Sequence, residues 1–192
     1  MKFPILKSKR LVLKELTQDY VNEVYNHFHD EQVSKYVDFE PVQTLEDAIE
    51  IIDWGLNLYQ NNRGILWGIF RGDKDIFIGQ INYVPRADEN FTGEVHRAEI
   101  GFDLTPTFWG RGYMSEAINL ANEYVFDQMK INRIEAIVHP LNTRAHRTLE
   151  KAGFKKEGIL REYVLFRGAF WDMFCYSLLK KEWKSNKFTK TQ

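Results

Sequence analysis

The segment at residues 108–116 has the sequence Phe-Trp-Gly-Arg-Gly-Tyr-Met-Ser-Glu, and the residues after it carry apolar side chains at the period of a helix. Two glycines just before a helix allow backbone N–H groups to approach an anion. The helix N-terminus adds partial positive charge there, and Arg111 adds a full charge. The segment lacks the Gly-Lys-Ser/Thr of a Walker loop. It predicts an anion-binding loop, and a tight turn in which the glycines only provide shape is the alternative.

The hydrophobic pattern on either side of this loop predicts a mixed α/β protein. Helices are expected to start at Thr17, Thr44 and Ser115, and a further one is expected over 143–152 with Gly153 at its end. Strands are expected at residues 11–16, 65–70, 76–84, 94–104, 133–139, 154–161 and 170–178. This order predicts a mixed, mostly antiparallel central sheet flanked by helices. Its one late strand–helix–strand crossover is where a ligand is expected to bind.

The composition is that of a globular protein. The 192 residues are 44% hydrophobic and 28% charged, and no linker or repeat divides them. We expect one domain over residues 1–180, followed by a polar Lys-rich tail at 181–192 that is solvated and frayed. The net charge of -1 gives no field that would recruit nucleic acid or an anionic membrane. A single cysteine, Cys175, and the lack of an apolar leader or spanning segment favour the cytoplasm.

A second polar segment follows the strand expected at 133–139. Asn142 opens a helix there, so its side chain is expected to cap that helix, with ligand contact as the alternative. The histidines show no metal-binding spacing: His27 and His29 are two apart on a helix, which favours a surface position. No metal site is expected.

Taken together, these segments make the chain resemble the GNAT acetyltransferase superfamily, and within it the RimJ/RimL-type ribosomal-protein N-acetyltransferases. The resemblance covers nearly the whole chain and depends on the order and spacing of its pieces. These are residues 8–13, 98–102, 109–117, 133–136, 142–154 and 168–172.

The resemblance implies that the protein binds acetyl-CoA in a cleft where two neighbouring strands splay apart. In the family, the pantetheine arm pairs with a strand backbone, which corresponds to Phe102, Asp103 and Leu104. The pyrophosphate is held by loop amides, which correspond to Gly110, Arg111, Gly112, Tyr113, Met114 and Ser115. Asn142 corresponds to a residue that contacts the coenzyme from the other side. Met114 departs from the family motif, which has Gly or Ala at that place.

The catalytic residues are less clearly marked. Glu99 alternates with Ala98 and Ile100 along its expected strand, and the resemblance makes it the candidate general base; a plain solvent-facing carboxylate is the alternative. Glu162, or water alone, remains open as the base. The serine that often donates a proton in the RimJ/RimL group is replaced by Ala145, which leaves Tyr163 as a candidate acid.

The sequence thus predicts an N-acetyltransferase that moves the acetyl group of acetyl-CoA to a primary amine by direct attack in a ternary complex. A protein N-terminus, with a pKa of about 7.7–8.0, becomes nucleophilic with only a modest base. It is the first choice of acceptor. A small amine such as a polyamine or an antibiotic is the second. An acidic rim for it is expected from Asp30, Glu31, Asp38 and Glu40, with plain surface as the alternative. A non-catalytic CoA-binding module is the rival. A homodimer is compatible with the sequence, which does not fix the oligomeric state.

Overall fold

The structure is a computed structural model that describes residues 2–37, 39–72, 74–87, 93–166 and 168–189, with side chains described through residue 185. The chain forms two compact units. The first comprises Met1–Val84 and Gly101–Asn122, and the second comprises Pro85–Ile100 and Glu123–Gln192. Of the residues considered above, Asp38 lies outside the described residues.

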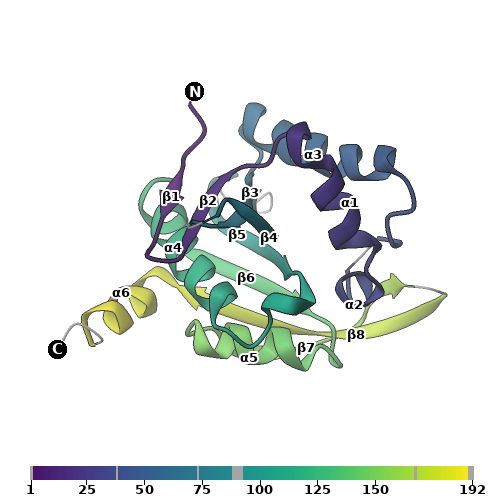
Figure 1. Cartoon of the computed structure of the whole chain (residues 1–192). Coiled ribbons are helices and arrows are strands. Elements are labelled where there is room, and N and C mark those ends of the chain that lie inside the picture. The colour runs from purple at the N-terminus through teal and green to yellow at the C-terminus, as the bar shows by residue number, and fades with distance from the viewer. Residues whose placement is uncertain (1, 38, 73, 88–92, 167, 190–192) are drawn as a thin grey trace. The chain divides into compact units, whose positions relative to one another are not determined.

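The first unit carries the early strands and helices of the chain (Figure 1). Its strands pair antiparallel in chain order from β1 to β4. These strands are β1 (Leu6–Lys7), β2 (Leu11–Glu15), β3 (Ile65–Arg71) and most of β4 (Ile76–Ala87). Its helices are η1 (Gln18–Tyr20), α1 (Val21–His29), α2 (Glu31–Ser34), α3 (Leu45–Gln60), η2 (Pro106–Phe108) and the first part of α4 (Tyr113–Asp127).

Helices α1 and α3 lie side by side and bury an apolar cluster in the first unit (Figure 1). Phe28 of α1 and Ile52 of α3 are fully buried in the same cluster as Leu66 and Phe70 of β3. The helix start predicted at Thr44 is confirmed, and a capping box forms there. The amide of Asp47 donates to Thr44 Oγ1 (3.2 Å), and the amide of Thr44 donates to Asp47 Oδ2 (2.9 Å). This cap fixes where α3 begins.

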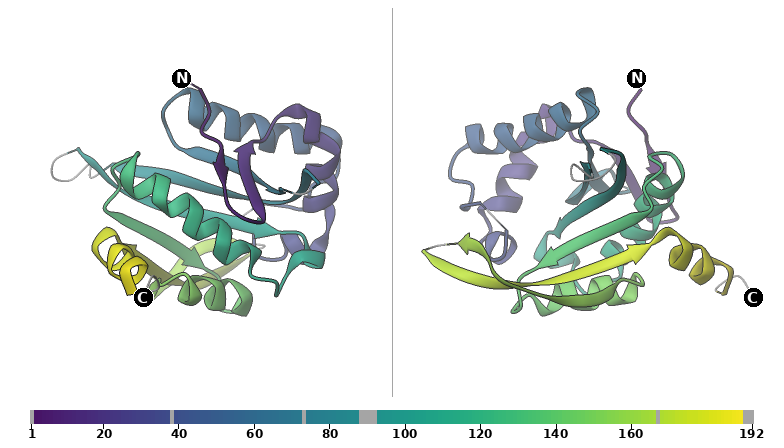
Figure 2. Two further views of the ribbon diagram at one scale, coloured as in Figure 1. Left: turned by 60° about the vertical axis from the view of Figure 1, so that its left-hand side comes forward. Right: turned by 180° about the vertical axis from the view of Figure 1, so that it is seen from behind.

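The second unit carries the late strands. These are β6 (Arg133–Val138), β7 (Lys155–Phe166) and β8 (Ala169–Leu179), with helices α5 (Thr143–Lys151) and α6 (Lys180–Thr189). β8 pairs antiparallel with both β6 and β7, and Figure 2 shows β7 and β8 as a long hairpin. β5 (Val95–Leu104) pairs parallel with β6. The strand order of the sheet is β1-β2-β3-β4-β5-β6-β8-β7, which confirms the predicted mixed, mostly antiparallel sheet.

Residues 180–189 differ from the frayed tail that the sequence predicts. Residues Lys180–Thr189 form α6, and Trp183 is only 6% exposed. Its indole lies 5.3 Å from the ring of Phe126, while Lys180 Nζ donates to the Phe126 carbonyl oxygen (2.5 Å). One buried indole removes a large apolar area from water, and this is enough to order a segment whose composition is otherwise polar.

An ion-pair network joins three strands of the second unit. The Arg133 guanidinium donates to Glu135 Oε1 (2.7 Å) and, through two nitrogens, to the carboxylate of Glu157, which also accepts from Ser177 Oγ (2.6 Å). Hydrogen bonds from Arg133 and then Ser177 lower the pKa of Glu157 to about 2. The network therefore holds β6, β7 and β8 together through charge-assisted bonds.

This network predicts a defined loss of stability in acid. Because the pKa of Glu157 is lower in the folded state than its ordinary 4.5, its contribution is complete above pH 4.5 and is lost as pH falls toward 2. We expect Glu157→Gln to lower the free energy of unfolding at pH 7 by roughly 1 kcal/mol, as for a partly exposed pair. Urea titrations from pH 7 to pH 2 measure this. If the free energies of unfolding of wild type and variant, plotted against pH, differed by a constant amount down to pH 2, the predicted role of Glu157 would be contradicted.

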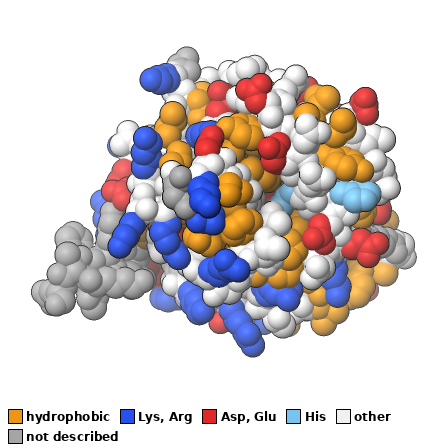
Figure 3. Space-filling view, in the orientation of Figure 1, with side chains coloured by type: hydrophobic (Ala, Val, Ile, Leu, Met, Phe, Trp, Pro, Cys, Tyr) orange, Lys and Arg blue, Asp and Glu red, His pale blue; other side chains and the backbone are white. Residues whose placement is uncertain are grey.

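Charged side chains of both signs occur on one face of the molecule. Figure 3 shows Lys and Arg side chains interleaved with Asp, Glu and apolar side chains on the face that it displays. Among the described residues, no helix is both long enough and apolar enough to span a bilayer.

Candidate functional site

The glycine loop has the backbone conformation that an anion site needs. Gly110 (φ 73°) and Gly112 (φ 77°) both lie in the left-handed region, where a residue with a Cβ is strained. The helix α4 begins directly afterwards at Tyr113, two residues earlier than the sequence predicts. The amide of Glu116 donates to the Gly112 carbonyl (3.1 Å), but the amides from Gly110 to Ser115 have no acceptor in the described part of the chain. They are free to bind an external anion.

Arg10 braces this loop from the turn before β2. Its guanidinium donates to the Arg111 carbonyl (3.1 Å) and to Glu116 Oε2 (2.6 Å), and it lies over the Tyr113 ring at 4.5 Å. Burial of Glu116 is outweighed by hydrogen bonds from Ser8 and Arg10, so the pKa of Glu116 lies below its ordinary value. Arg10 therefore holds the loop and the first turn of α4 in one arrangement.

The other loop residues point in different directions. Met114 is 7% exposed, so its side chain belongs to the core and its bulk does not cover the open side of the loop. Arg111 is exposed, and Ser115 is half-buried. The departure from the family motif at Met114 therefore leaves the loop amides accessible.

The end of β5 presents backbone groups on one side. The ladder between β5 and β6 has three pairs and ends at Glu99 and Glu135, although β5 continues to Leu104. The amide of Thr105 donates to the Ile78 carbonyl of β4 (2.9 Å). Because backbone groups alternate in direction along a strand, those of Phe102 and Leu104 point away from β4.

Asp103 differs from its two neighbours. A Cβ on Gly79 of β4 would lie 2.2 Å from the Asp103 carbonyl oxygen, so this carbonyl faces β4 and not a ligand. The Leu104 carbonyl accepts from Trp109 Nε1 (2.6 Å). The backbone groups left for a ligand are both polar groups of Phe102 and the amide of Leu104.

His27 is buried, although the sequence predicts a surface position for it. The surface position predicted for it is wrong: it is 2% exposed, and its Nε2 lies 2.6 Å from Asp103 Oδ1 while its Nδ1 lies 2.8 Å from Thr105 Oγ1. Its place on the stripe of Val24 and Phe28, at helical spacing, was the signal that could have indicated burial. His27 thus ties α1 to the end of β5.

Glu99 lies on β5 as predicted, opposite in the alternation to the buried Ala98 and Ile100. Its Oε2 accepts from Arg86 Nη2 (3.0 Å), and its side chain is 37% exposed. The second carboxylate oxygen has no partner in the described residues, so it can accept a proton or hold a water.

Asn142 caps α5, and its Oδ1 accepts from the amide of Ala145 (3.1 Å). The preceding turn is held by His139, whose Nδ1 accepts from the amide of Leu141 (3.2 Å). Burial, and then the charge of His146, lower the pKa of His139, which favours the neutral ring that this bond requires. The capping role is therefore present, and the side-chain NH₂ of Asn142 has no acceptor within the part of the chain that the structure describes.

Tyr163 and Glu162 lie on β7, where the pairing with β8 is irregular. Tyr163 is 57% exposed, and Glu162 has φ 47° with its amide donating to Asp172 Oδ1 (2.8 Å). The register shifts between Leu160 and Val164. Simple alternation along the strand, which would place Glu162 and Val164 on one face, therefore does not hold here.

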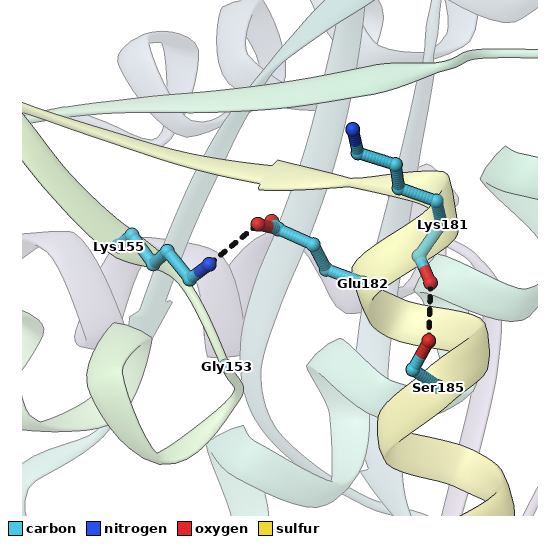
Figure 4. A pocket seen from close by; sticks show the side chains of 5 residues that line it. All are labelled: Gly153, Lys155, Lys181, Glu182 and Ser185. Atoms are coloured by element: carbon cyan, nitrogen blue, oxygen red, sulfur yellow. Dashed lines mark hydrogen bonds and ion pairs between the residues drawn. The ribbon is translucent and has the colours of Figure 1, made fainter.

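A shallow pocket of about 370 Å³ in the second unit contains none of these residues (Figure 4). Lys155 and Glu182 form an ion pair across it (2.6 Å), and Ser185 donates to the Lys181 carbonyl (3.0 Å). Lys155, Glu182 and Ser185 are thus already paired within the pocket. No cluster of three or more His, Cys, Asp or Glu side chains suited to a metal occurs in the described parts of the chain.

Comparison with known proteins identifies the family. The family model described as an acetyltransferase (GNAT) domain matches residues 10–155. The uncharacterized N-acetyltransferase YoaA of Bacillus subtilis (strain 168) is 36% identical over 178 residues, which are 93% of this chain and 98% of that protein. The crystal structure of a GNAT-family acetyltransferase from Bacillus anthracis has a TM-score of 0.81 at 27% identity, covering 93% of this chain and 100% of that one. The chain therefore belongs to the GNAT acetyltransferase family.

A more distant relative is the ribosomal protein uS5-alanine N-acetyltransferase of Escherichia coli (strain K12). It is 28% identical over 125 residues, which are 65% of this chain and 62% of that protein. The resemblance stated from the sequence is thus confirmed. The protein is an N-acetyltransferase, an acyltransferase that depends on acetyl-CoA.

Proposed function

We propose that this N-acetyltransferase acetylates the N-terminal amine of a protein, by direct attack of the amine on acetyl-CoA bound in the same complex. Residues 1–180 form the catalytic domain in this proposal. The relative from E. coli, whose name gives alanine of ribosomal protein uS5 as its acceptor, supports this choice. The cytoplasmic location predicted from the sequence stays a prediction.

The main support for acetyl-CoA binding is the run of backbone amides from Gly110 to Ser115, which have no acceptor among the described residues. These amides and the charge of Arg111 suit a pyrophosphate. The outward backbone groups of Phe102 and Leu104 suit the amides of the pantetheine arm, and Asn142 adds a side-chain donor. Asp103 supports this strand through its side chain instead of its backbone.

Acetyl-CoA supplies an activated acetyl thioester, and the residues of this chain have to place it and handle one proton. The amine nitrogen forms a bond to the acetyl carbon, the carbon–sulfur bond breaks, and the sulfur leaves as a thiolate. Glu99, through its free oxygen, takes the proton from the amine directly or through water. A thiolate with a pKa near 8.5 is a good leaving group, so Tyr163 or water suffices as the acid. Positioning of the two substrates then supplies much of the rate.

Thiol release from acetyl-CoA tests both the acceptor and the base. We expect turnover on peptides that begin with Ala, Ser or Met to exceed turnover on polyamines and aminoglycosides. We expect Glu99→Gln to reduce it more than tenfold, about 1.4 kcal/mol in the barrier. Glu50→Gln, at an exposed position on α3, is the matched control.

Other outcomes point elsewhere. Turnover unchanged in Glu99→Gln leaves positioning and water as the mechanism. A preference for polyamines or aminoglycosides overturns the protein acceptor.

A further inference from the structure

Two amide side chains lie on the face of β4 that looks toward the apolar cluster under α1 and α3. Gln80 and Asn82 share one face of the strand, because side chains alternate along it. They pair in register with Gly68 and Leu66 of β3. Leu66 belongs to the apolar cluster under α1 and α3. Polar groups at these positions thus interrupt an otherwise apolar layer.

The end of β5 adds an acid to the same face. A Cβ on Gly101 would lie 2.5 Å from Asn82 Oδ1, whereas a Cβ on Gly79 would meet the side chain of Leu104 on the opposite face. Asp103, two residues after Gly101, therefore shares the face of Gln80 and Asn82. The bond from Thr105 to Ile78 sets a register that puts Gln80 opposite Asp103.

The amide of Gln80 is incompletely satisfied. Gln80 is only 6% exposed, and its Oε1 is buried with no hydrogen-bond donor among the described residues. Buried polar atoms almost always have a partner, since the loss of water is otherwise uncompensated. Asn122 also has an unpartnered nitrogen, but its oxygen accepts from Tyr83 (2.7 Å), which fixes it in the core. No comparable hydrogen bond holds the Gln80 side chain among the residues that the structure describes.

The neighbours of Gln80 indicate which kind of chemical group could bind to its Oε1. The Asp103 carboxylate is a pure acceptor and is held by His27 from α1. Asn82 brings both its Oδ1 and its Nδ2 next to Gly101, so the groups on this face that only accept are the Asp103 carboxylate and Gln80 Oε1. Such acceptors fit a ligand that brings N–H donors. Phe102 and Leu104, on either side of Asp103, are the residues whose backbone groups point away from β4.

We propose that Gln80 is a binding residue for the amine substrate, whose N–H donates to Gln80 Oε1 beside the His27–Asp103 pair. This deepens the proposed function, on which it rests, by naming the group that recognises the acceptor amine. The ligand class is a primary amine. In the free protein the unpaired oxygen is a free-energy penalty, and the N–H of the bound substrate removes this penalty.

Gln80→Met tests this, because methionine keeps the length of the side chain and removes both polar atoms. We expect the KM for the acceptor to rise about fivefold and the KM for acetyl-CoA to stay within twofold. We also expect a Tm equal to or above that of wild type, since an unpaired buried group is removed. Gln32→Met, at an exposed position on α2, should leave all three values unchanged.

The measurements use the full chain and a panel of N-terminal peptides, polyamines and aminoglycosides, with acceptor binding also followed by thermal shift. A lower Tm together with a parallel rise in both KM values would show a structural role and overturn the proposal. So would an unchanged acceptor KM, or a wild-type protein that binds no amine of the panel. A polyamine preference that is still sensitive to Gln80→Met would overturn the protein acceptor and retain this residue's role.

Discussion

Gly79→Ala should lower the free energy of unfolding more than a glycine-to-alanine substitution at any other described strand position. The new Cβ would lie 2.2 Å from the Asp103 carbonyl oxygen and 2.8 Å from the Leu104 Cα, and both are backbone atoms that cannot rotate away. Gly79 also has φ 149°, a conformation that residues with side chains rarely adopt. We expect a loss of at least about 3 kcal/mol in the free energy of unfolding, measured by urea titration.

Gly158→Ala is the matched control for this variant. Its Cβ would have no heavy atom within 4 Å, and its φ is not in the left-handed region. We expect its stability to remain within about 0.5 kcal/mol of wild type. If the two variants were equally stable, the close approach of β4 and β5 at Gly79 would not exist in solution.

Gly112→Val should weaken the binding of acetyl-CoA at least tenfold, about 1.4 kcal/mol. Gly112 has φ 77°, and a residue with a Cβ in this region is strained by about 1–2 kcal/mol, more when it is β-branched. The space itself is open, with Arg10 Nη2 the nearest atom at 3.6 Å, so the strain acts on the backbone. The loop would turn its amides away from the ligand. Isothermal titration calorimetry with acetyl-CoA measures the Kd.

The stability of this variant distinguishes a local effect from a global one. Because the loop is exposed, we expect Gly112→Val to lose far less stability than Gly79→Ala. Gly158→Val should bind acetyl-CoA as wild type does. A Kd within twofold of wild type for Gly112→Val would mean that the loop amides do not hold the donor.

Local patterns in the sequence predicted those parts of the fold that depend on a few neighbouring residues. The capping box of Thr44 and Asp47 satisfies the first amides of α3 from within four residues, so it could be identified without the rest of the chain. The same is true of Gly153, whose φ of 91° ends α5, and of the glycines before α4. Local hydrogen bonding and backbone sterics are sufficient there.

Other features depend on contacts between residues that are far apart in the sequence. His27 was expected at the surface, but its partners Asp103 and Thr105 come from a strand and a turn more than seventy residues later. The irregular pairing around Glu162 depends on the opposite strand β8. The buried place of Trp183 depends on Phe126. In each instance the determining contact is non-local, so the pattern around the residue itself did not reveal it.

The candidate site also combines features that follow from local sequence with features that depend on distant contacts. The sequence by itself determined the GNAT family, the glycine loop and the position of Glu99 on its strand, because these depend on motif spacing and strand alternation. Only the tertiary structure decided that Arg10 braces the loop, that the Asp103 carbonyl faces β4, and that Gln80 Oε1 is buried with no hydrogen-bond donor among the residues that the structure describes. Those features depend on which strands pair and in which register, and the register is fixed by contacts across the sheet that a linear pattern does not contain.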